Sequence, residues 1–513
     1  MDLLNSPYLS IAIIAIYMIL VVYIGTIAWR HFPQSDPESY LLARRGLSGW
    51  VSSLTIQATQ ISALTFLGFI GSMYTFGISF WQAIMGYLFM VPLLWIIFNA
   101  RIWKLGRRFG QVTFGDMVAY YFGNNRWVAA TIGFAMMLAL IPYVQAQFAG
   151  LGYVIEIASG GIITFNVAII ISYLVMIFYV LMGGMRAVAY TDAFQGILIL
   201  GGLIGGGLLM VLIGAGGFGN AFDNIITTEP RRVLVAELGP FGNWLYLFTW
   251  AVAVNLGWPL HPHMWNKQHI ARHIEFTRYL PAIHMLQVWL IFIGAYFISI
   301  AGLNILPGLN PLQAQTVTVD AAIKVFPLAI VGIFAAGGLA AMMSTVAGQI
   351  HSVGTVFARD FLIKFIQHLP EERQVWWTRT VILAHGTISL MLVLSGETLL
   401  TTVGALAAGL GVQILPVGVA VLTNQRWVTA SGVIASIISG IGISVVLGLG
   451  WFNGFINTLI ANTCPPSGAC SPGGIFYAFY ALILNTVVLI GVSALTHDRP
   501  DPQVRAQYAQ VGW

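Results

Sequence analysis

Thirteen apolar stretches, each long enough to cross a lipid bilayer, follow one another along this chain of 513 residues. A membrane-spanning helix needs about 20 predominantly apolar residues. The stretches cover residues 8–29, 51–73, 80–100, 127–151, 161–182, 190–213, 243–264, 280–303, 327–350, 376–396, 399–422, 428–449 and 474–496. Charged residues make up only 8% of the chain, whereas soluble domains carry about 25%. The sequence therefore predicts an all-α polytopic membrane protein and excludes a soluble enzyme.

The positions of the lysine and arginine residues predict the topology, because cytoplasmic loops carry an excess of both. With the N-terminus outside and thirteen alternating spans, nineteen of the 22 basic residues fall on the inner side. Arg231, Arg232 and Lys324 fall outside, and one span more or fewer would scramble this division. We therefore expect thirteen transmembrane helices in the cell (inner) membrane, with the N-terminus outside and the C-terminus cytoplasmic.

The second stretch is unusually polar for a helix that faces lipid. Residues 54–71 carry six hydrogen-bonding side chains: Thr55, Gln57, Thr59, Gln60, Ser62 and Thr65. Hydrocarbon offers such groups no partners, so this helix must face the protein interior or a water-filled cavity. Polar groups at this depth indicate a functional site. Hydrogen bonds that hold neighbouring helices together are the alternative interpretation.

The ninth stretch places small residues and two hydroxyl groups together at 335–345. Ala341, Ser344 and Thr345 are spaced i, i+3 and i+4, so they share one face of a helix. Hydroxyl oxygens and a nearby carbonyl on an uncrowded face suit a hard monovalent cation, since hard cations prefer oxygen ligands. The alternative is a packing face whose hydroxyls bond back to carbonyls of the preceding turn.

The seventh stretch contains Asn-Leu-Gly-Trp-Pro at residues 255–259, which predicts an interrupted helix. Proline removes a backbone donor, and helices commonly kink at proline and glycine. This interruption lies five spans after the polar stretch at 51–73. Corresponding interrupted segments in two halves of a chain are typical of an inverted repeat with a binding site near the middle of the membrane.

Asp192 is one of very few acidic residues inside a predicted span and lies near its inner end. A charge deep in a membrane helix costs about 2.5–3.5 kcal/mol even on the lenient scale. It therefore needs a cation, a basic partner or a proton. The alternative is an interfacial position, with Asp192 paired with Arg186 or capping the start of the helix.

Further amide side chains lie in other stretches. Gln147 follows Tyr143 in the fourth stretch, and Gln413 lies in the eleventh. Each alone is more typical of a hydrogen bond between helices. Together with Gln57 and Gln60, they are candidates to line a hydrogen-bonding pocket.

Four histidines, His261, His263, His269 and His273, closely follow the interruption. A metal site is disfavoured because no thiolate or carboxylate ligands accompany them. We expect these histidines to lie at the membrane interface.

The cysteines Cys464 and Cys470 both fall in the last predicted outside loop. An oxidising compartment permits a disulfide there, and we expect one because both residues lie on the same non-cytoplasmic side. Two free thiols in a flexible loop are the alternative.

Three stretches together resemble the sodium/solute symporter family, which includes proline, pantothenate, monocarboxylate and sugar cotransporters. Residues 183–195, Gly-Gly-Met-Arg-Ala-Val-Ala-Tyr-Thr-Asp-Ala-Phe-Gln, resemble the family signature. Residues 340–345 resemble its ion-site helix and residues 54–68 its first core helix. The resemblance implies a sodium site formed by the carbonyls of Ala58, Ile61 and Ala341 and the hydroxyls of Ser344 and Thr345. It also implies that Asp192 matches an acidic residue near the inner ion exit.

The family's fold is a five-plus-five inverted repeat, with broken first and sixth core helices. The resemblance then divides the chain into five parts. They are a peripheral helix and linker at 1–46, the first repeat at 47–214, an external loop at 215–242, the second repeat at 243–425, and two peripheral helices with the tail at 426–513.

Within the family, residues 62–68, 142–152 and 258–262 look most like the monocarboxylate permease branch. Gln60 departs from the proline carriers, which have an aspartate at that position. Since no arginine or lysine lies in the predicted core, a carboxylate would be held by helix N-terminal amides, hydroxyls and glutamines. The substrate-binding candidates are Gln57, Gln60, Ser62, Tyr143, Gln147, Asn255, Trp258 and Gln413.

These features favour a sodium-coupled secondary symporter that imports a small organic solute by alternating access, with a short monocarboxylate as the candidate solute. Sodium, the solute and the bilayer are the expected partners. No enzymatic activity, nucleic acid or obligate protein partner is expected. One alternative is a proton-coupled carrier that uses Asp192 or a histidine. A solute-sensing membrane protein is another, and the absence of an expected output domain weighs against it.

Overall fold

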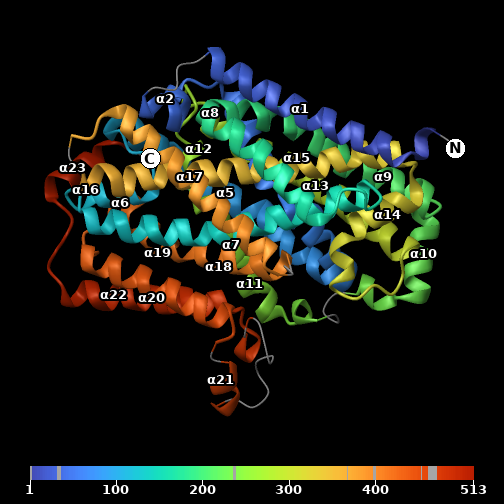
Figure 1. The fold of residues 1–513 in the computed structure, drawn as a ribbon. Coiled ribbons are helices and arrows are strands. Elements are labelled where there is room, and N and C mark those ends of the chain that lie inside the picture. Colours follow the sequence, from blue (N-terminus) through green and yellow to red (C-terminus); the bar gives the residue numbers. More distant parts are fainter. Residues whose placement is uncertain are drawn as a thin grey trace.

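A computed structural model describes residues 3–31, 36–234, 239–366, 368–396, 400–451, 453–459, 469 and 471–512. Within these ranges the regular structure is helical, with one isolated bridge between Leu47 and Ala271 and no strand. The long helices form one bundle, and the two ends of the chain lie toward opposite ends of it (Figure 1).

Ten continuous helices in the described ranges are long and apolar enough to cross a membrane. They are α1 (Pro7–His31), α5 (Ile78–Phe109), α7 (Arg126–Ala158), the run Phe165–Gly214 that begins with α8 (Phe165–Leu200), α13 (Phe276–Ile305), the run Leu328–Phe365 that begins with α15 (Leu328–Val356), α17 (Glu371–Leu394), Thr402–Leu422, α20 (Ala430–Gly448) and α22 (Tyr477–Leu495). An eleventh span arises if α3 (Gly49–Gln60) and the segment Leu64–Phe76, which meet at 54°, are taken together.

The difference from the thirteen predicted spans arises at two places. The run Phe165–Gly214 is 50 residues long, and at 1.5 Å per residue it reaches about 75 Å, more than twice the hydrocarbon thickness. It is kinked at Gly184, whose φ of 53° and ψ of −150° suit glycine. The expected seventh span is broken into α11 (Trp244–Gly257), a 3-10 turn at Trp258–Leu260 and α12 (Pro262–Lys267), so it forms no long continuous helix.

Shorter helices either connect the long ones or form parts of the runs named above. They are α2 (Pro37–Leu42), α4 (Ile70–Phe76), α6 (Phe114–Tyr121), α9 (Gly207–Leu209), α10 (Phe218–Thr228), α14 (Val317–Val325), α16 (Ile363–Phe365), α18 (Leu400–Gly411), α19 (Leu415–Leu422), α21 (Asn453–Leu459) and α23 (Pro502–Gln510). Helix α21 projects from the bundle (Figure 1). Cys464 and Cys470 lie outside the described residues, so the predicted disulfide stays a prediction.

Helix α15 is the central element, because it packs against α1, α3, α7 and α8 and its residues are almost all buried. Its small residues make this possible, since they let helices approach closely without bulky side chains. A Cβ atom at Gly337 would lie 2.9 Å from the carbonyl oxygen of Leu198, and one at Gly338 would lie 2.5 Å from the ring of Phe66. The backbone of α15 therefore comes close to both α8 and the segment that follows α3.

An ionic cluster holds α6 to the far end of the run that contains α15. The carboxylate of Asp116 lies 2.7 Å from Nη2 of Arg359 and 2.9 Å from Nζ of Lys364. Burial raises the pKa of the Asp116 carboxyl, but the two cations more than offset it, so its pKa lies below the ordinary 3.8. The cluster therefore contributes stability at neutral pH.

We expect the substitution Asp116→Asn to lower the free energy of unfolding by about 1–3 kcal/mol at pH 7, because the two cations lose their partner. Since the folded pKa lies below 3.8, the loss should be full above about pH 4, shrink as the pH falls further, and disappear only below the lowered folded pKa, where the parent carboxyl is itself protonated. Unfolding of the detergent-solubilised protein as a function of pH measures both effects. The control Asp223→Asn removes an exposed carboxylate. An equal loss in both variants would contradict the assignment.

Candidate functional site

The polar helix α3 ends in the interior of the bundle. It stops at Gln60, Ile61 adopts extended backbone angles, and a π-helical segment starts at Leu64. The side chain of Gln147 supports this break, because its Oε1 accepts a hydrogen bond of 2.7 Å from the amide of Ala63. The carbonyl groups at the end of α3 are therefore released from the regular helical pattern and point to neighbouring elements.

Two hydroxyl groups of α15 meet these carbonyls. Ser344 Oγ lies 2.9 Å from the carbonyl oxygen of Ala58 and 3.1 Å from that of Ala341. Thr345 Oγ1 lies 3.0 Å from the carbonyl oxygens of Thr59 and Ile61 and 2.9 Å from that of Ala341. Ser344 and Thr345 are fully buried.

This cluster has more acceptors than protons. Each hydroxyl carries a single hydrogen, so two protons face five contacts to carbonyl oxygens. Buried carbonyl groups without donors are unfavourable, whereas a hard cation is satisfied by several oxygens at once. We call the hydroxyls of Ser344 and Thr345 and the carbonyls of Ala58, Thr59, Ile61 and Ala341 the oxygen cage.

The structure thus brings together all five residues that the sequence proposes as sodium ligands, and it adds the carbonyl of Thr59. The bonds from Ser344 and Thr345 to Ala341 also match the alternative interpretation, in which hydroxyls bond back to the preceding turn. That alternative does not account for the additional contacts to α3, which join two separate elements.

Asp192 lies beside the cage, and its partner corrects the sequence analysis. The carboxylate pairs with Lys267 at 2.6 Å, and both side chains are fully buried. Arg186, the partner considered from sequence, instead donates to the carbonyl of Ala43. Asp192 does not cap the start of a helix, since it lies inside α8 beyond the kink at Gly184. The expectation that no lysine or arginine enters the core was therefore wrong.

Thr55 and Thr59 complete this buried pair. Thr55 Oγ1 donates to Asp192 Oδ2 at 2.5 Å, and Thr59 Oγ1 lies 3.2 Å from the same oxygen. The ammonium of Lys267 also donates to Thr59 Oγ1 and lies 3.3 Å from the carbonyl of Thr55. Thr59 therefore contributes its carbonyl to the oxygen cage and its hydroxyl to the ion pair.

The sequence analysis did not predict Lys267 as a partner of Asp192, because the predicted seventh span ends at residue 264 and leaves Lys267 in the following loop. The short helix α12 continues the broken seventh span into the interior and ends at Lys267. The lone acidic residue in an apolar stretch was the available signal, since a buried carboxylate requires a partner. The sequence did not indicate which basic residue would supply it.

A small cavity lies next to the break in α3. Its volume is about 20 Å³, enough for little more than one water molecule. Five of the eight substrate-binding candidates line it: Gln60, Ser62, Tyr143, Asn255 and Trp258. The apolar part of the wall includes Phe69, Trp250 and Phe292. None of the described lining residues carries an ionised side chain.

The other three candidates do not line this cavity. Gln147 supports the break in α3, and its Nε2 donates to the carbonyl of Tyr143 at 3.1 Å. Gln57 lies 3.2 Å from Nδ1 of His284. Gln413 donates to the carbonyl of Gly409 at 2.9 Å, where it packs beside α22, so the structure assigns it to helix packing.

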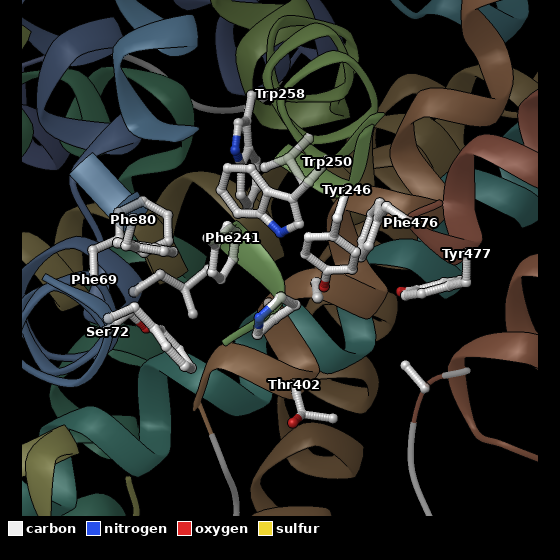
Figure 2. A pocket seen from close by; sticks show the side chains of 17 residues that line it. Phe69, Ser72, Phe80, Phe241, Tyr246, Trp250, Trp258, Thr402, Phe476 and Tyr477 are labelled. Carbon is white, nitrogen blue, oxygen red and sulfur yellow. The ribbon is translucent and has the colours of Figure 1, made fainter. Parts of the chain in front are cut away.

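A wider vestibule of about 340 Å³ adjoins the small cavity and shares Leu64, Phe69, Trp250 and Trp258 with it. Figure 2 shows the aromatic rings of Phe80, Phe241, Tyr246 and Trp250 gathered around this space. The edge-on contacts of Phe241 with Phe80 and Trp250, at 4.9 and 5.5 Å, join α5, α11 and the segment before α11. The path to the polar cavity is therefore predominantly apolar.

The structure buries three of the four histidines that follow the interruption, and their expected position at the membrane interface stays a prediction. His261, His263 and His269 are buried, and only His273 is exposed. They fold inward because the chain after Trp258 turns back into the bundle as α12 instead of leaving it. No group of three or more potential metal ligands occurs in the described part of the chain.

Comparison with known proteins agrees with this architecture. The model of the sodium:solute symporter family matches residues 40–440. A sodium/pantothenate symporter of Haemophilus influenzae is 26% identical over 333 residues, which are 63% of this chain and 66% of that protein. A sodium/proline symporter of Staphylococcus aureus is 22% identical over 510 residues, covering 96% of this chain and 94% of that protein.

Solved structures share the fold. A substrate-bound, outward-open Na⁺-coupled sialic acid symporter superposes with a TM-score of 0.73 at 18% identity, covering 96% of this chain and 98% of that one. A nucleobase-cation-symport-1 family transporter in a closed conformation gives a TM-score of 0.54 at 14% identity, covering 94% and 99%.

The family model covers well over half of the sequence, so this chain belongs to the sodium:solute symporter family. Members of this family are sodium-coupled secondary transporters, not enzymes. The chain is accordingly a multi-pass membrane protein that couples sodium to the transport of a solute.

We expect the variants Asp192→Asn and Lys267→Met each to lower the stability by about 3–5 kcal/mol, because each leaves one buried charge without its partner. The double variant should lose less than the sum, since it removes both charges together. Equilibrium unfolding in detergent micelles measures this cycle. Losses that simply add in the double variant would show that the two groups do not interact.

Proposed function

We propose that this protein is a sodium-coupled symporter that imports a small organic carboxylate by alternating access, with sodium held in the oxygen cage. The observation that carries the proposal is the excess of buried carbonyl oxygens over hydroxyl protons where α3 ends against α15. A sodium ion would supply the positive charge that this set of oxygens lacks. The hydroxyls of Ser344 and Thr345 would then turn their protons away and offer lone pairs to the ion.

The position of the cage suggests how the ion would be coupled to conformation. Its ligands come from two elements, the end of α3 and the middle of α15, so an ion bound there favours the arrangement in which both are in contact. A ligand shifts a conformational equilibrium only through such differential affinity. The membrane potential adds about 2.3 kcal/mol per 100 mV for each charge that crosses it completely.

Asp192 is proposed as the first group on the inward path of the ion. Thr59 connects the cage to the Asp192–Lys267 pair, so an ion that leaves the cage on this side meets a carboxylate that the lysine already holds. Release would therefore require Lys267 to move away. This role explains why a costly charge pair is retained in the interior.

The proposed topology has thirteen spans. It counts the bent α3 segment, divides the long run at Gly184 and treats α11 with α12 as one broken span. The opposite positions of the two chain ends support an odd number (Figure 1). We keep the five-plus-five repeat, with halves at 47–214 and 243–425, the N-terminus outside and the C-terminus cytoplasmic, as part of this proposal.

A carboxylate substrate is supported by the wall of the small cavity. Gln60 accepts a hydrogen bond from Tyr87 at 2.5 Å through Oε1, which leaves its buried Nε2 without an acceptor. The described lining residues include no carboxylate that would hold an ammonium group. The named relatives carry pantothenate, proline and sialic acid, which are all carboxylic acids. The small volume and the aromatic walls favour a short monocarboxylate.

The double substitution Ser344→Ala and Thr345→Ala tests the sodium site. We expect sodium-driven uptake into proteoliposomes to fall by about tenfold or more, because each lost ligand weakens ion binding by about 1.5–3 kcal/mol. The matched control is Ser352→Ala, which removes a buried hydroxyl two turns further along the same helix, a hydroxyl for which the described residues offer no hydrogen-bond partner. Unchanged sodium dependence in the double variant would refute the assignment. Uptake driven by a pH gradient without sodium would favour the proton-coupled alternative.

A thermal-shift screen tests the solute class. Short monocarboxylates, amino acids and sugars are compared, each in sodium and in potassium. We expect monocarboxylates to stabilise the protein in sodium and to have little effect in potassium, because ion and solute would bind the same conformation. Solute binding without measurable transport would instead favour a sensor.

A further inference from the structure

Two of the buried histidines lie directly behind the small cavity. Tyr143 and Trp258 form part of its wall, and their rings are 4.7 Å apart. On the other side of this wall, His261 lies 5.8 Å from Tyr143 and 5.2 Å from Trp258, measured between ring centroids. His263 lies 5.5 Å from Tyr143 and 5.6 Å from His261. The two imidazoles form the next layer beyond the cavity.

These imidazoles have unused hydrogen-bonding capacity. Both ring nitrogens of His261, and Nδ1 of His263, are buried without a hydrogen-bond partner among the described residues. A neutral imidazole always presents one N–H donor and one acceptor nitrogen, so each ring must bury at least one group that seeks a partner. Buried polar groups are nearly always paired, and the exceptions call for an explanation.

Packing alone does not explain the pair. Gly411 leaves the room that His261 occupies, because a Cβ atom at this glycine would lie 2.3 Å from Nε2 of the ring. The ring is thus closely accommodated, yet its nitrogens face no acceptor or donor. The buried His385 differs from His261 in that one of its two nitrogens is used: Nε2 lies 3.3 Å from the carbonyl oxygen of Met137, whereas Nδ1 has no partner among the described residues. A metal is disfavoured, because the described residues supply no third ligand.

We propose, building on the symport function above, that His261 and His263 form a second, inner binding station for the carboxylate of the transported solute. The solute first occupies the cavity beside Gln60. When Tyr143 and Trp258 rotate during inward opening, its carboxylate oxygens accept hydrogen bonds from the two imidazole N–H groups. Trp258 lies in the 3-10 turn after α11, and His261 and His263 follow at the start of α12, so one movement of this segment would open the wall and present the donors.

This station would add two N–H donors to the amide and hydroxyl groups of the cavity wall. The described cavity wall offers amide and hydroxyl groups but no cation for a carboxylate. Neutral N–H donors hold a carboxylate without the strong attraction of a permanent charge. Binding that is favourable but weak allows the solute to leave toward the inside, a requirement shared by all conduction pathways.

The test compares three variants with the parent in proteoliposomes. His261→Leu with His263→Leu removes both donors, His261→Gln with His263→Gln retains an N–H group at each position, and His385→Leu is the matched control. The probes are acetate, propionate, lactate, pyruvate, pantothenate and proline, and the solute that the parent transports fastest is used throughout. Sodium binding is followed separately by sodium-dependent thermal stabilisation without solute.

We expect the leucine pair to reduce the maximal uptake rate by about tenfold or more, because hydrogen bonds to a charged group are lost. The KM for external solute and the sodium-dependent stabilisation should stay within about twofold of the parent, since the outer cavity and the cage are untouched. The glutamine pair should recover part of the rate, and His385→Leu should not change it.

Three results would overturn the proposal. The first is parental transport by the leucine pair. The second is an equal loss of rate in the leucine and glutamine pairs together with lost sodium stabilisation, which would show a structural role. The third is a parent that binds sodium but transports none of the carboxylates, which would reject the carboxylate station while leaving the sodium site intact. If the leucine pair does not fold, His261→Asn and His263→Asn are measured singly. Each should lower the maximal uptake rate and leave the KM for external solute within about twofold of the parent.

Discussion

The contact between the broken end of α3 and the small-residue face of α15 determines how the rest of the bundle is arranged. Carbonyl groups at the end of a helix need donors, and in this interior the nearest are two hydroxyls of a neighbouring helix. The hydroxyls come close enough only because glycines and alanines keep the surface of α15 flat. The result is an oxygen-rich contact in which two protons face five contacts to carbonyl oxygens, and the proposed sodium site rests on this imbalance.

Much of this contact could be predicted from residues that stand out against an apolar background. The polar side chains of α3, and Ser344 and Thr345 on a small-residue helix, are conspicuous because hydrocarbon tolerates few such groups. The break near Trp258 was predictable for a different reason, since glycine and proline interrupt helices locally. In both cases a short stretch of sequence contains the physical cause of the structure.

The partners of these groups could not be predicted in the same way. The charge of Asp192 implied a partner, but Lys267 was hidden by its position after a helix break, where the chain turns inward instead of leaving the membrane. The burial of His261 and His263 was missed for the same reason. Gln413 looks like a pocket residue in sequence, yet it bonds within its own helix and to α22. Such outcomes depend on which helices become neighbours, and periodicity does not encode that.

The ionic cluster at Asp116 has a mechanical consequence. Arg359 and Lys364 lie at the far end of the same continuous run of helix that carries Ser344 and Thr345. That end is fastened to α6, while the middle of the run meets the end of the broken helix α3. Helix α15 is thus suited to act as a lever with its pivot at α6, so that a slight tilt near the ion would become a larger displacement at the opposite extremity.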